Sequence, residues 1–391
     1  MADAVYIYDA LRTPRGKARP DGGLAALTPP GLVKALVDAL TERTDGASSN
    51  PGALLLGCVT QAGTQGGNVA MAAKQHARLP DTCAAHTLNN YCASGLSAIG
   101  HAVATVAAGH ERVVLAGGVE MMSSAPFLSD KAEFYSDTSL PPARRFLPPV
   151  LAADRLAAAE GITRPELDAC ALTSQQRAAA SDMDLLLQAS RLDLGLLTGE
   201  ECIRPGTNLD ALAQMPPAFG LLQHEYTEAL EGQTFEPLHT LSHAPPVCDG
   251  AGLALIGCEG LGKRPRARVL AYAESGGDPA ASLTAGFAAM DKALARAGHS
   301  LEDMDRIEFM EAFAVTVAKF MRDRAPDPDK VNASGGHLAK GHPMGATGAI
   351  LISTLLDALD ADSGRLGLVI TTGAMGVGAA MVVERLSPNA A

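Results

Sequence analysis

The sequence contains no tryptophan, and aromatic residues make up only 4% of its 391 residues. Basic residues are in the minority, because 31 Lys and Arg stand against 43 Asp and Glu and give a net charge of −12. This balance argues against a general nucleic-acid surface, although it leaves room for a small basic pocket for an anionic ligand. The many Gly, Ala and aliphatic residues are typical of tightly packed α/β layers, and the length predicts two or three domains.

The seven cysteines form no C-x-x-C pair and no spacing typical of a metal site, so we expect no metal. No secretory signal pattern is present at the start of the sequence. We therefore expect reduced cysteines without disulfides in a cytoplasmic protein. No charged residue occurs in 366–383, but this segment contains four glycines and two adjacent threonines. It predicts two buried strands around a turn rather than a membrane span.

Cys92 stands immediately before a run of small residues that predicts a helix from Gly95 to about Ala108, followed by the apolar strand 113–116. A cysteine at a helix N-terminus meets unpaired N–H groups and the positive end of the helix dipole. Both features favour the thiolate, which is the nucleophilic form. Cys92 is therefore a candidate nucleophile, and the alternative is a small buried core residue.

A second stretch repeats this layout. His342 precedes a small-residue helix from Gly345 to about Leu359, which leads to the apolar strand 366–371. Cys92 and His342 both have glycine three places later. The pattern indicates an internal duplication in which two similar halves each present a helix N-terminus.

The remaining chain alternates predicted strands and helices, which indicates a mainly parallel sheet covered on both faces. The exception is 120–246, where prolines and loops dominate. Inside it we expect one helix at 150–160 and another that Thr163 and Glu166 begin as a capping box. We predict an N-terminal half at 1–119 plus about 247–265, an inserted loop domain at 120–246, and a C-terminal half at 266–391. An insertion of this length usually covers substrate or serves assembly.

The chain resembles the thiolase family. Four motifs stand in the order and spacing of that family: 90–95 (NYCASG), 117–123 (GGVEMMS), 311–314 (EAFA) and 341–348 (GHPMGATG). Residues 12–16 (RTPRG) fit as well, so the resemblance covers essentially the whole chain. It looks closest to the type that serves fatty-acid β-oxidation beside a hydratase–dehydrogenase partner.

The resemblance implies two βαβαβαββ halves packed as five α/β/α/β/α layers, with the inserted loop domain. It implies reversible Claisen chemistry on acyl-CoA thioesters, in which Cys92 carries the acyl group and His342 raises its nucleophilicity. The backbone N–H groups of Cys92 and Ala374 would hold the oxyanion. Phe313 and the insertion would line the pantetheine tunnel. Coenzyme A would be part of substrate and product, with no bound cofactor.

Three positions depart from the family pattern. No cysteine follows Cys258, so the second catalytic cysteine of the family is absent. Thr372 or, with a two-residue shift, Ile370 takes its place, and a threonine hydroxyl is far too weak an acid to do the same proton transfer unaided. Met310 replaces an Asn or His that supports the oxyanion, and methionine cannot donate a hydrogen bond. Pro245 stands where a serine usually lies near the pantetheine.

Several further residues have open roles. We expect His337 at the surface, with a compensating polar role as the alternative, while His243 either faces the pocket or does not. We expect Cys248 and Cys258 in the core. The basic loop, formed by Arg12, Arg15, Lys17 and Arg19, is either a solvated face or a contact for CoA phosphates.

Two functions therefore remain. The first is an acyl-CoA acyltransferase of the thiolase type, acting through an acyl-Cys92 intermediate with altered or impaired later steps. The second is a thiolase-like acyl-CoA binding or assembly protein, or a slow acyl-CoA hydrolase, without Claisen activity. An acyltransferase whose acceptor needs no deprotonation at carbon lies between them. The resemblance also implies a homodimer or a dimer of dimers, and edge strands of a large sheet invite such pairing.

Overall fold

The computed structural model describes residues 4–386, and its N-terminal half is a five-stranded mixed sheet. The middle strands β3 (Ala53–Gly57) and β5 (Val113–Met121) run parallel to the edge strand β4 (Ala84–Leu88). On the other side of β5, β6 (Cys248–Gly257) pairs antiparallel with both β5 and β1 (Tyr6–Arg12). The short β2 (Gly16–Lys17) also pairs with β6. The helices of this half are α1 (Pro29–Arg43), α2 (Val69–Ala77) and α3 (Ser94–Ala107).

The C-terminal half repeats this order. Its strands are β7 (Ala267–Gly276), β10 (Val377–Arg385), β9 (Leu366–Gly373) and β8 (Arg306–Phe309), and Val331 bridges the outer side of β8. Counted from its outer edge, the C-terminal sheet has the order Val331 bridge, β8, β9, β10, β7. The N-terminal sheet, counted from its own outer edge, has the equivalent order β4, β3, β5, β6, β1. The predicted duplication is thus confirmed, as are the two buried strands expected within 366–383. The helices here are α7 (Ala285–Ala297), α8 (Ala314–Arg324), α9 (His337–Lys340) and α10 (Thr347–Ala361).

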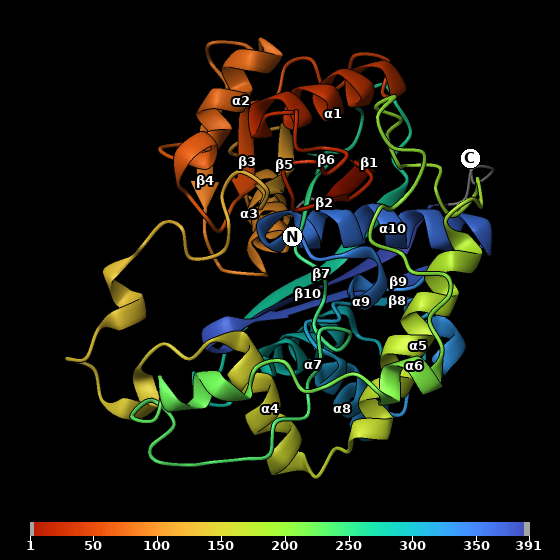
Figure 1. The fold of residues 1–391 in the computed structure, drawn as a ribbon. Helices are drawn as coiled ribbons and strands as arrows, with labels where there is room; N and C mark the ends of the chain where they lie inside the picture. Colours follow the sequence, from red (N-terminus) through yellow and green to blue (C-terminus); the bar gives the residue numbers. More distant parts are fainter. Residues whose placement is uncertain (1–3, 387–391) are drawn as a thin grey trace.

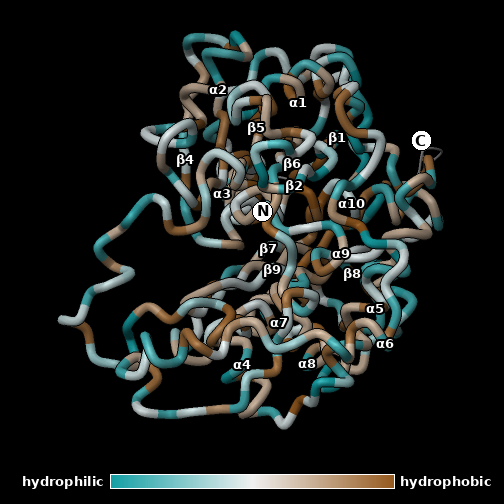
Figure 2. Tube along the Cα trace, in the orientation of Figure 1, coloured by the Kyte–Doolittle hydropathy of each residue, from teal (hydrophilic) through white to brown (hydrophobic). Residues whose placement is uncertain are grey.

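The two sheets face each other across α3 and α10, which form the central layer (Figure 1). Helices α1 and α2 cover the outer face of one sheet, and α7 and α8 cover the outer face of the other. The sheets join at one edge, where Tyr6 and Ile7 of β1 pair with Arg268 and Ala267 of β7. This is the five-layer arrangement that the resemblance implied. The expectation of a mainly parallel sheet is wrong, because six of the nine pairings between the described strands are antiparallel. Figure 2 shows hydrophobic residues gathered along the strands and central helices, where burial stabilises the layers.

The segment between β5 and β6 contains helices α4 (Pro149–Glu160), α5 (Arg164–Ser181) and α6 (Leu209–Ala213), and the rest is loops. The predicted capping box is present, because Glu166 accepts hydrogen bonds from the backbone N–H and hydroxyl of Thr163. β6 follows this segment in sequence but returns to the N-terminal sheet. The exact domain boundaries stay a prediction. Short 3₁₀ helices occur at Gly63–Gln65, Glu133–Ser136, Pro142–Arg144, Gly220–His224, Pro328–Lys330, Met344–Ala346 and Ala374–Gly376.

One helical stretch in residues 4–386, Met344–Ala361, is long and apolar enough to cross a membrane, but 89% of it is buried inside the protein. It contains α10 and packs against α3 at the centre of the fold. The two helices come so close that a Cβ placed on Gly348 would lie 2.3 Å from the backbone nitrogen of Leu96. A Cβ on Gly95 would lie 2.6 Å from the carbonyl oxygen of Gly345. Only glycine allows this approach of backbone to backbone.

We expect Gly348→Ala to lower the free energy of unfolding by about 1–3 kcal/mol, because the new methyl group forces the backbones of α3 and α10 apart. Urea unfolding followed by circular dichroism measures this change. Gly206→Ala is the matched control, since a Cβ there meets no atom within 4 Å. Equal stability of the two variants would contradict the proposed tight contact.

Candidate active site

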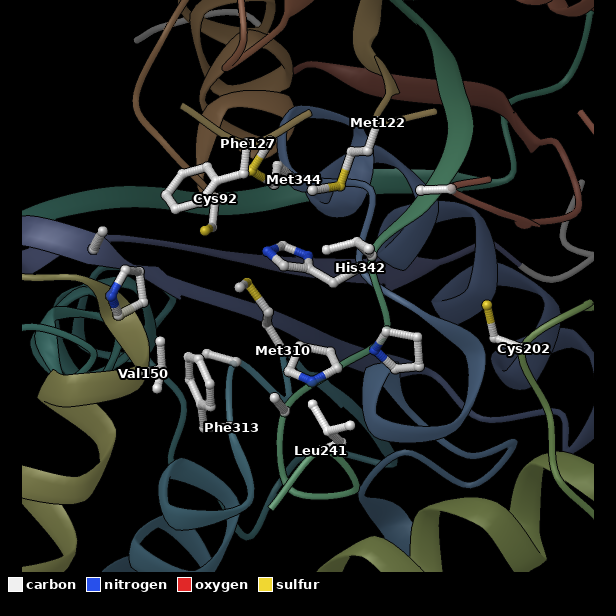
Figure 3. A pocket seen from close by; sticks show the side chains of 18 of the residues that line it. Cys92, Met122, Phe127, Val150, Cys202, Leu241, Met310, Phe313, His342 and Met344 are labelled. Carbon is white, nitrogen blue, oxygen red and sulfur yellow. The ribbon is translucent and has the colours of Figure 1, made fainter. Parts of the chain in front are cut away.

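A cavity of about 650 Å³ lies where the two halves and the insertion meet. Cys92 and His342 both line it, from the loops before α3 and α10, and Figure 3 shows their side chains facing the same space. Its wall is mainly carbon and sulfur, contributed by residues that include Val59, Met122, Phe127, Val150, Leu241, Met310, Phe313 and Met344. The duplication therefore brings together the two residues that the sequence singled out.

The turn before α3 has an unusual backbone. Tyr91 has a φ of 45°, in the left-handed region that is uncommon for residues other than glycine. Ser94 fixes this turn, because its hydroxyl donates to the Tyr91 carbonyl at 2.5 Å and accepts from the Asn90 N–H at 2.8 Å. Met375, directly after Ala374, is also left-handed, with a φ of 58°. Such local strain often marks functional sites.

The surroundings of Cys92 favour the protonated form of its thiol. Burial raises the pKa of Cys92 to about 12, a hydrogen bond from the Ala374 backbone N–H lowers it, and the Glu120 charge raises it. The N–H of Cys92 itself also hydrogen bonds to the sulfur. The expected effect of the helix N-terminus is thus outweighed by burial, and the thiol needs a base to become nucleophilic.

His342 has the properties of that base. Burial, and then the charge of Arg15, lower the pKa of His342 to about 3, so the ring is neutral. Its Nδ1 lies 2.6 Å from the hydroxyl oxygen of Thr347, while Nε2 has no hydrogen-bond partner. When Nδ1 carries the proton and donates to Thr347, Nε2 has a free lone pair for a proton from Cys92.

A buried carboxylate ties the turn before α10 to the segment after β3. Glu120 accepts hydrogen bonds from the backbone N–H groups of Val59, Thr60 and Gly345 at 2.9–3.0 Å, and from the side chain of Gln65 at 2.8 Å. Gly345 belongs to the turn that begins α10, whereas the other partners follow β3. Burial raises the pKa of Glu120, and these donors oppose that effect. The sequence marked Glu120 only as part of a motif and gave no sign of this role.

The other predicted site residues divide into two groups. Met310, Phe313 and Pro245 line the cavity, and Ala374 lies beside the thiol. Thr372 does not line it, because its hydroxyl accepts from the N–H of Gly286 in α7 at 3.4 Å. His243 is also outside the cavity wall.

His243 serves the fold of the insertion. Its Nε2 lies 2.7 Å from Asp168 of α5, and its Nδ1 accepts from the Thr240 N–H. Its backbone carbonyl accepts from the N–H of Ala314, the first residue of α8. These contacts hold the segment before β6 against the Phe313 wall.

Two expectations are wrong. His337 is not at the surface, since it is 1% exposed and its ring packs edge-to-face on His342 with 5.6 Å between ring centroids. The basic loop is not a solvated face throughout, because Arg12 and Arg15 are buried. They pair with Asp357 and Glu200, which lie far away in sequence, so no local pattern marks their burial.

The basic loop still contributes to the cavity. Lys17 and Arg19 line it, together with Arg204 from the insertion. Cys202, which the sequence did not single out, lines it as well, and Figure 3 shows it on the side away from Val150. All seven cysteines are free; Cys248 is buried as expected and Cys258 is partly exposed. No group of three or more metal-binding side chains occurs within residues 4–386.

Comparisons with known proteins agree along the whole chain. Residues 5–222 match the family model described as thiolase, N-terminal domain, and residues 263–385 match thiolase, C-terminal domain. A β-ketoadipyl-CoA thiolase of Pseudomonas aeruginosa is 35% identical over 99% of this chain and 100% of its own length. An acetyl-CoA acetyltransferase of Chromobacterium violaceum (32%) and a 3-ketoacyl-CoA thiolase of Aliivibrio fischeri (31%) each align over 97% of this chain and 99% of their own length.

We expect Thr347→Ala to slow alkylation of Cys92 by iodoacetamide about tenfold at neutral pH, because the variant loses the hydroxyl that orients the His342 ring. Mass spectrometry of the Cys92 peptide over time gives the rate. Thr354→Ala is the control on the same helix, since the Thr354 hydroxyl only returns to the carbonyl of Ile350. Equal rates in the two variants would show that Thr347 does not orient the base.

Proposed function

Because the chain belongs to the thiolase family and is an acyl-CoA acyltransferase of that type, we propose that it cleaves or forms 3-ketoacyl-CoA through an acyl thioester on Cys92. The observation that carries this proposal is the meeting of Cys92, a neutral His342 and the Ala374 N–H in one apolar cavity. A nucleophile, a base and an oxyanion donor are the parts that acyl transfer requires.

In the cleavage direction, Nε2 of His342 takes the Cys92 proton while the sulfur attacks the 3-keto carbon. The negative charge then develops on the former carbonyl oxygen. The N–H groups of Cys92 and Ala374, which already point at the sulfur, are suited to hold that oxygen. The left-handed residues Tyr91 and Met375 keep these two donors at fixed positions.

The proton then has a complete route without a second cysteine. When the bond between C2 and C3 breaks, its electron pair remains on C2, and His342 returns its proton there to give a shortened acyl-CoA and acyl-Cys92. In the second half, His342 takes the proton of the incoming CoA thiol, the CoA sulfur displaces Cys92, and the proton returns to the Cys92 sulfur. Thr372 has no part in this route, because its hydroxyl lies against Gly286.

A second function follows from Met310. It lines the cavity with no hydrogen-bond donor, so the enolate that forms when C2 leaves has no support from this side chain. Loss of one such donor slows other enzymes by about 3 kcal/mol of barrier. Some acceptors, water among them, form no carbanion. Transfer of the acyl group from Cys92 to such an acceptor avoids the higher barrier that the missing donor causes. An acyl-CoA binding or assembly role without turnover is the remaining alternative.

The cavity also restricts the substrate. Around Cys92 the cavity wall is apolar, which suits a fatty acyl chain and supports a role in fatty acid metabolism. The cations Lys17, Arg19 and Arg204 also line the cavity, and they suit the phosphates of coenzyme A. Relatives are named for different acyl groups, β-ketoadipyl and 3-ketoacyl among them. Sequence identity to these relatives therefore does not identify the acyl group of the substrate.

We further propose that two copies pair through β4. This strand is at the edge of the N-terminal sheet, and in the described chain it pairs only with β3. It immediately precedes the turn that carries Cys92, so pairing there would stiffen the site. A hydratase–dehydrogenase partner and a cytoplasmic location stay predictions.

Thiolysis of a short and a long 3-ketoacyl-CoA with free CoA tests the function. We expect wild-type turnover with faster cleavage of the long chain, and at least a thousandfold loss in Cys92→Ala, because the variant lacks the thiol that accepts the acyl group. A spectrophotometric assay of the ketoacyl thioester gives the rates.

Mass spectrometry of the intact protein separates the alternatives. An acyl adduct on Cys92 without thiolysis would support transfer to another acceptor, and release of free acid would identify that acceptor as water. The absence of both turnover and adduct would refute the acyltransferase and leave the binding role. Cys83→Ala is the control, since Cys83 is a buried core residue directly before β4 and is not part of the cavity wall.

We expect the double variant Lys17→Ala, Arg204→Ala to raise the KM for acyl-CoA about tenfold at low salt and to leave the KM for the matching pantetheine thioester unchanged, because only CoA carries the phosphates. Steady-state kinetics with both substrates measures this. Lys34→Ala, in an exposed pair on α1, controls for lost surface charge. An equal rise of both KM values would show that these cations contact the pantetheine or acyl part of the substrate and not the phosphates.

A further inference from the structure

Three imidazole nitrogens without a hydrogen-bond partner lie close together behind the cavity. They are Nε2 of His342 and both ring nitrogens of His337. The two rings meet at 86° with 5.6 Å between their centroids. A buried polar atom without a partner destabilises the folded protein, so two such atoms on one side chain require an explanation.

His337 is held neutral by its surroundings. Burial, and then the charges of Arg15, His342 and Lys340, lower its pKa well below the ordinary value. Arg15 approaches from the segment after β1 and Lys340 from α9 itself, and Glu200 from the insertion pairs with Arg15. A neutral ring has a lone pair on one nitrogen, and that lone pair is unused.

His337 is not among the residues that line the cavity, and its side chain is buried behind His342. Its ring contact is with His342, the group that must carry a proton during the proposed reaction. Protonated His342 would be a cation in a buried site beside Arg15, whose guanidinium also donates to the Gly341 carbonyl at 3.3 Å. Thr347 accepts from only one edge of the His342 ring. Something else has to stabilise the transient charge.

We propose that His337 is a positioning residue that stabilises the protonated form of His342 by presenting a neutral imidazole dipole to it. This inference rests on the proposed function. No proton moves to His337; the proton passes from the Cys92 sulfur to Nε2 of His342 and on to C2 of the leaving group. The unpaired nitrogens lower stability in the resting protein, and they favour the charged state in which His342 works.

Alkylation of Cys92 by iodoacetamide, followed by mass spectrometry from about pH 6 to about pH 9, tests the proposal without any turnover. His337→Phe keeps the edge-to-face ring contact but removes both nitrogens, and we expect it to slow alkylation about tenfold at neutral pH. His337→Gln keeps an acceptor of similar reach, and we expect it to remain within about threefold of wild type. His110→Phe, in the exposed turn after α3, is the control for an added aromatic residue.

Two outcomes would overturn the proposal. If His337→Phe reacts at the wild-type rate, the ring is only an apolar wall. If the alkylation rate of His337→Gln is as low as that of His337→Phe, the reactivity of Cys92 depends on the shape of the ring and not on a hydrogen-bond acceptor. Thermal unfolding verifies that each variant folds, and His337→Leu against His337→Gln provides the same comparison if the Phe variant does not. Absence of thiolysis in the wild type would refute the proposed 3-ketoacyl-CoA cleavage. Alkylation needs no substrate, so the alkylation rates test the role of His337 independently of that result.

Discussion

The close approach of α3 and α10 is the constraint on which the site depends. Both helices begin at the end of a loop that carries a reactive side chain, so bringing their N-termini together brings Cys92 and His342 together. Glycine at 95 and 348 permits backbone contact that any Cβ would prevent. Glu120 then holds the turn before α10 against the segment after β3, since one buried carboxylate bonds to backbone N–H groups of both. The duplication gives each half an equivalent helix N-terminus, and the small residues between α3 and α10 allow these two N-termini to lie close together.

Burial determines the electrostatics of that pair. In water a thiol and an imidazole differ by about two pKa units, but here burial separates them much further, with Cys92 near 12 and His342 near 3. Both groups are therefore neutral in the resting site. In the proposed mechanism, charge separates only when substrate brings a carbonyl beside the N–H groups of Cys92 and Ala374, which would hold the developing oxyanion. Apolar walls keep water from competing for these donors, so reactivity depends on the substrate being present.

Local signals in the sequence predicted the duplication and marked Cys92 and His342 as candidate reactive residues, whereas the five layers were implied by the family resemblance. A cysteine or histidine before a small-residue helix, a Thr163–Glu166 capping box and an uncharged strand pair are all readable within a dozen residues. It failed where partners are distant. Arg12 and Arg15 sit in a turn-rich loop, and their burial depends on Asp357 and Glu200, which fold back from other elements. His337 has the local features of a surface turn, yet α9 folds under the His342 loop. The orientation of Thr372 toward α7 likewise follows from strand register, which its neighbours do not reveal.

The two departures at the site affect different halves of the chemistry. In the proposed mechanism, formation of acyl-Cys92 uses the thiol, His342 and two backbone N–H groups, and the structure brings these groups together. Generation of a carbanion at C2 needs a donor for the enolate and a base near that carbon. Met310 removes the first, and Thr372 does not reach the cavity to replace the second. One histidine must then serve both sulfur and carbon, and each proton it carries is a buried charge beside Arg15. The barrier for carbon–carbon cleavage therefore depends on how well the surroundings of His342 tolerate that charge, whereas acyl transfer between sulfur atoms requires the charge only briefly. The residues behind the histidine, rather than those facing the substrate, thus decide which of the two reactions this cavity favours.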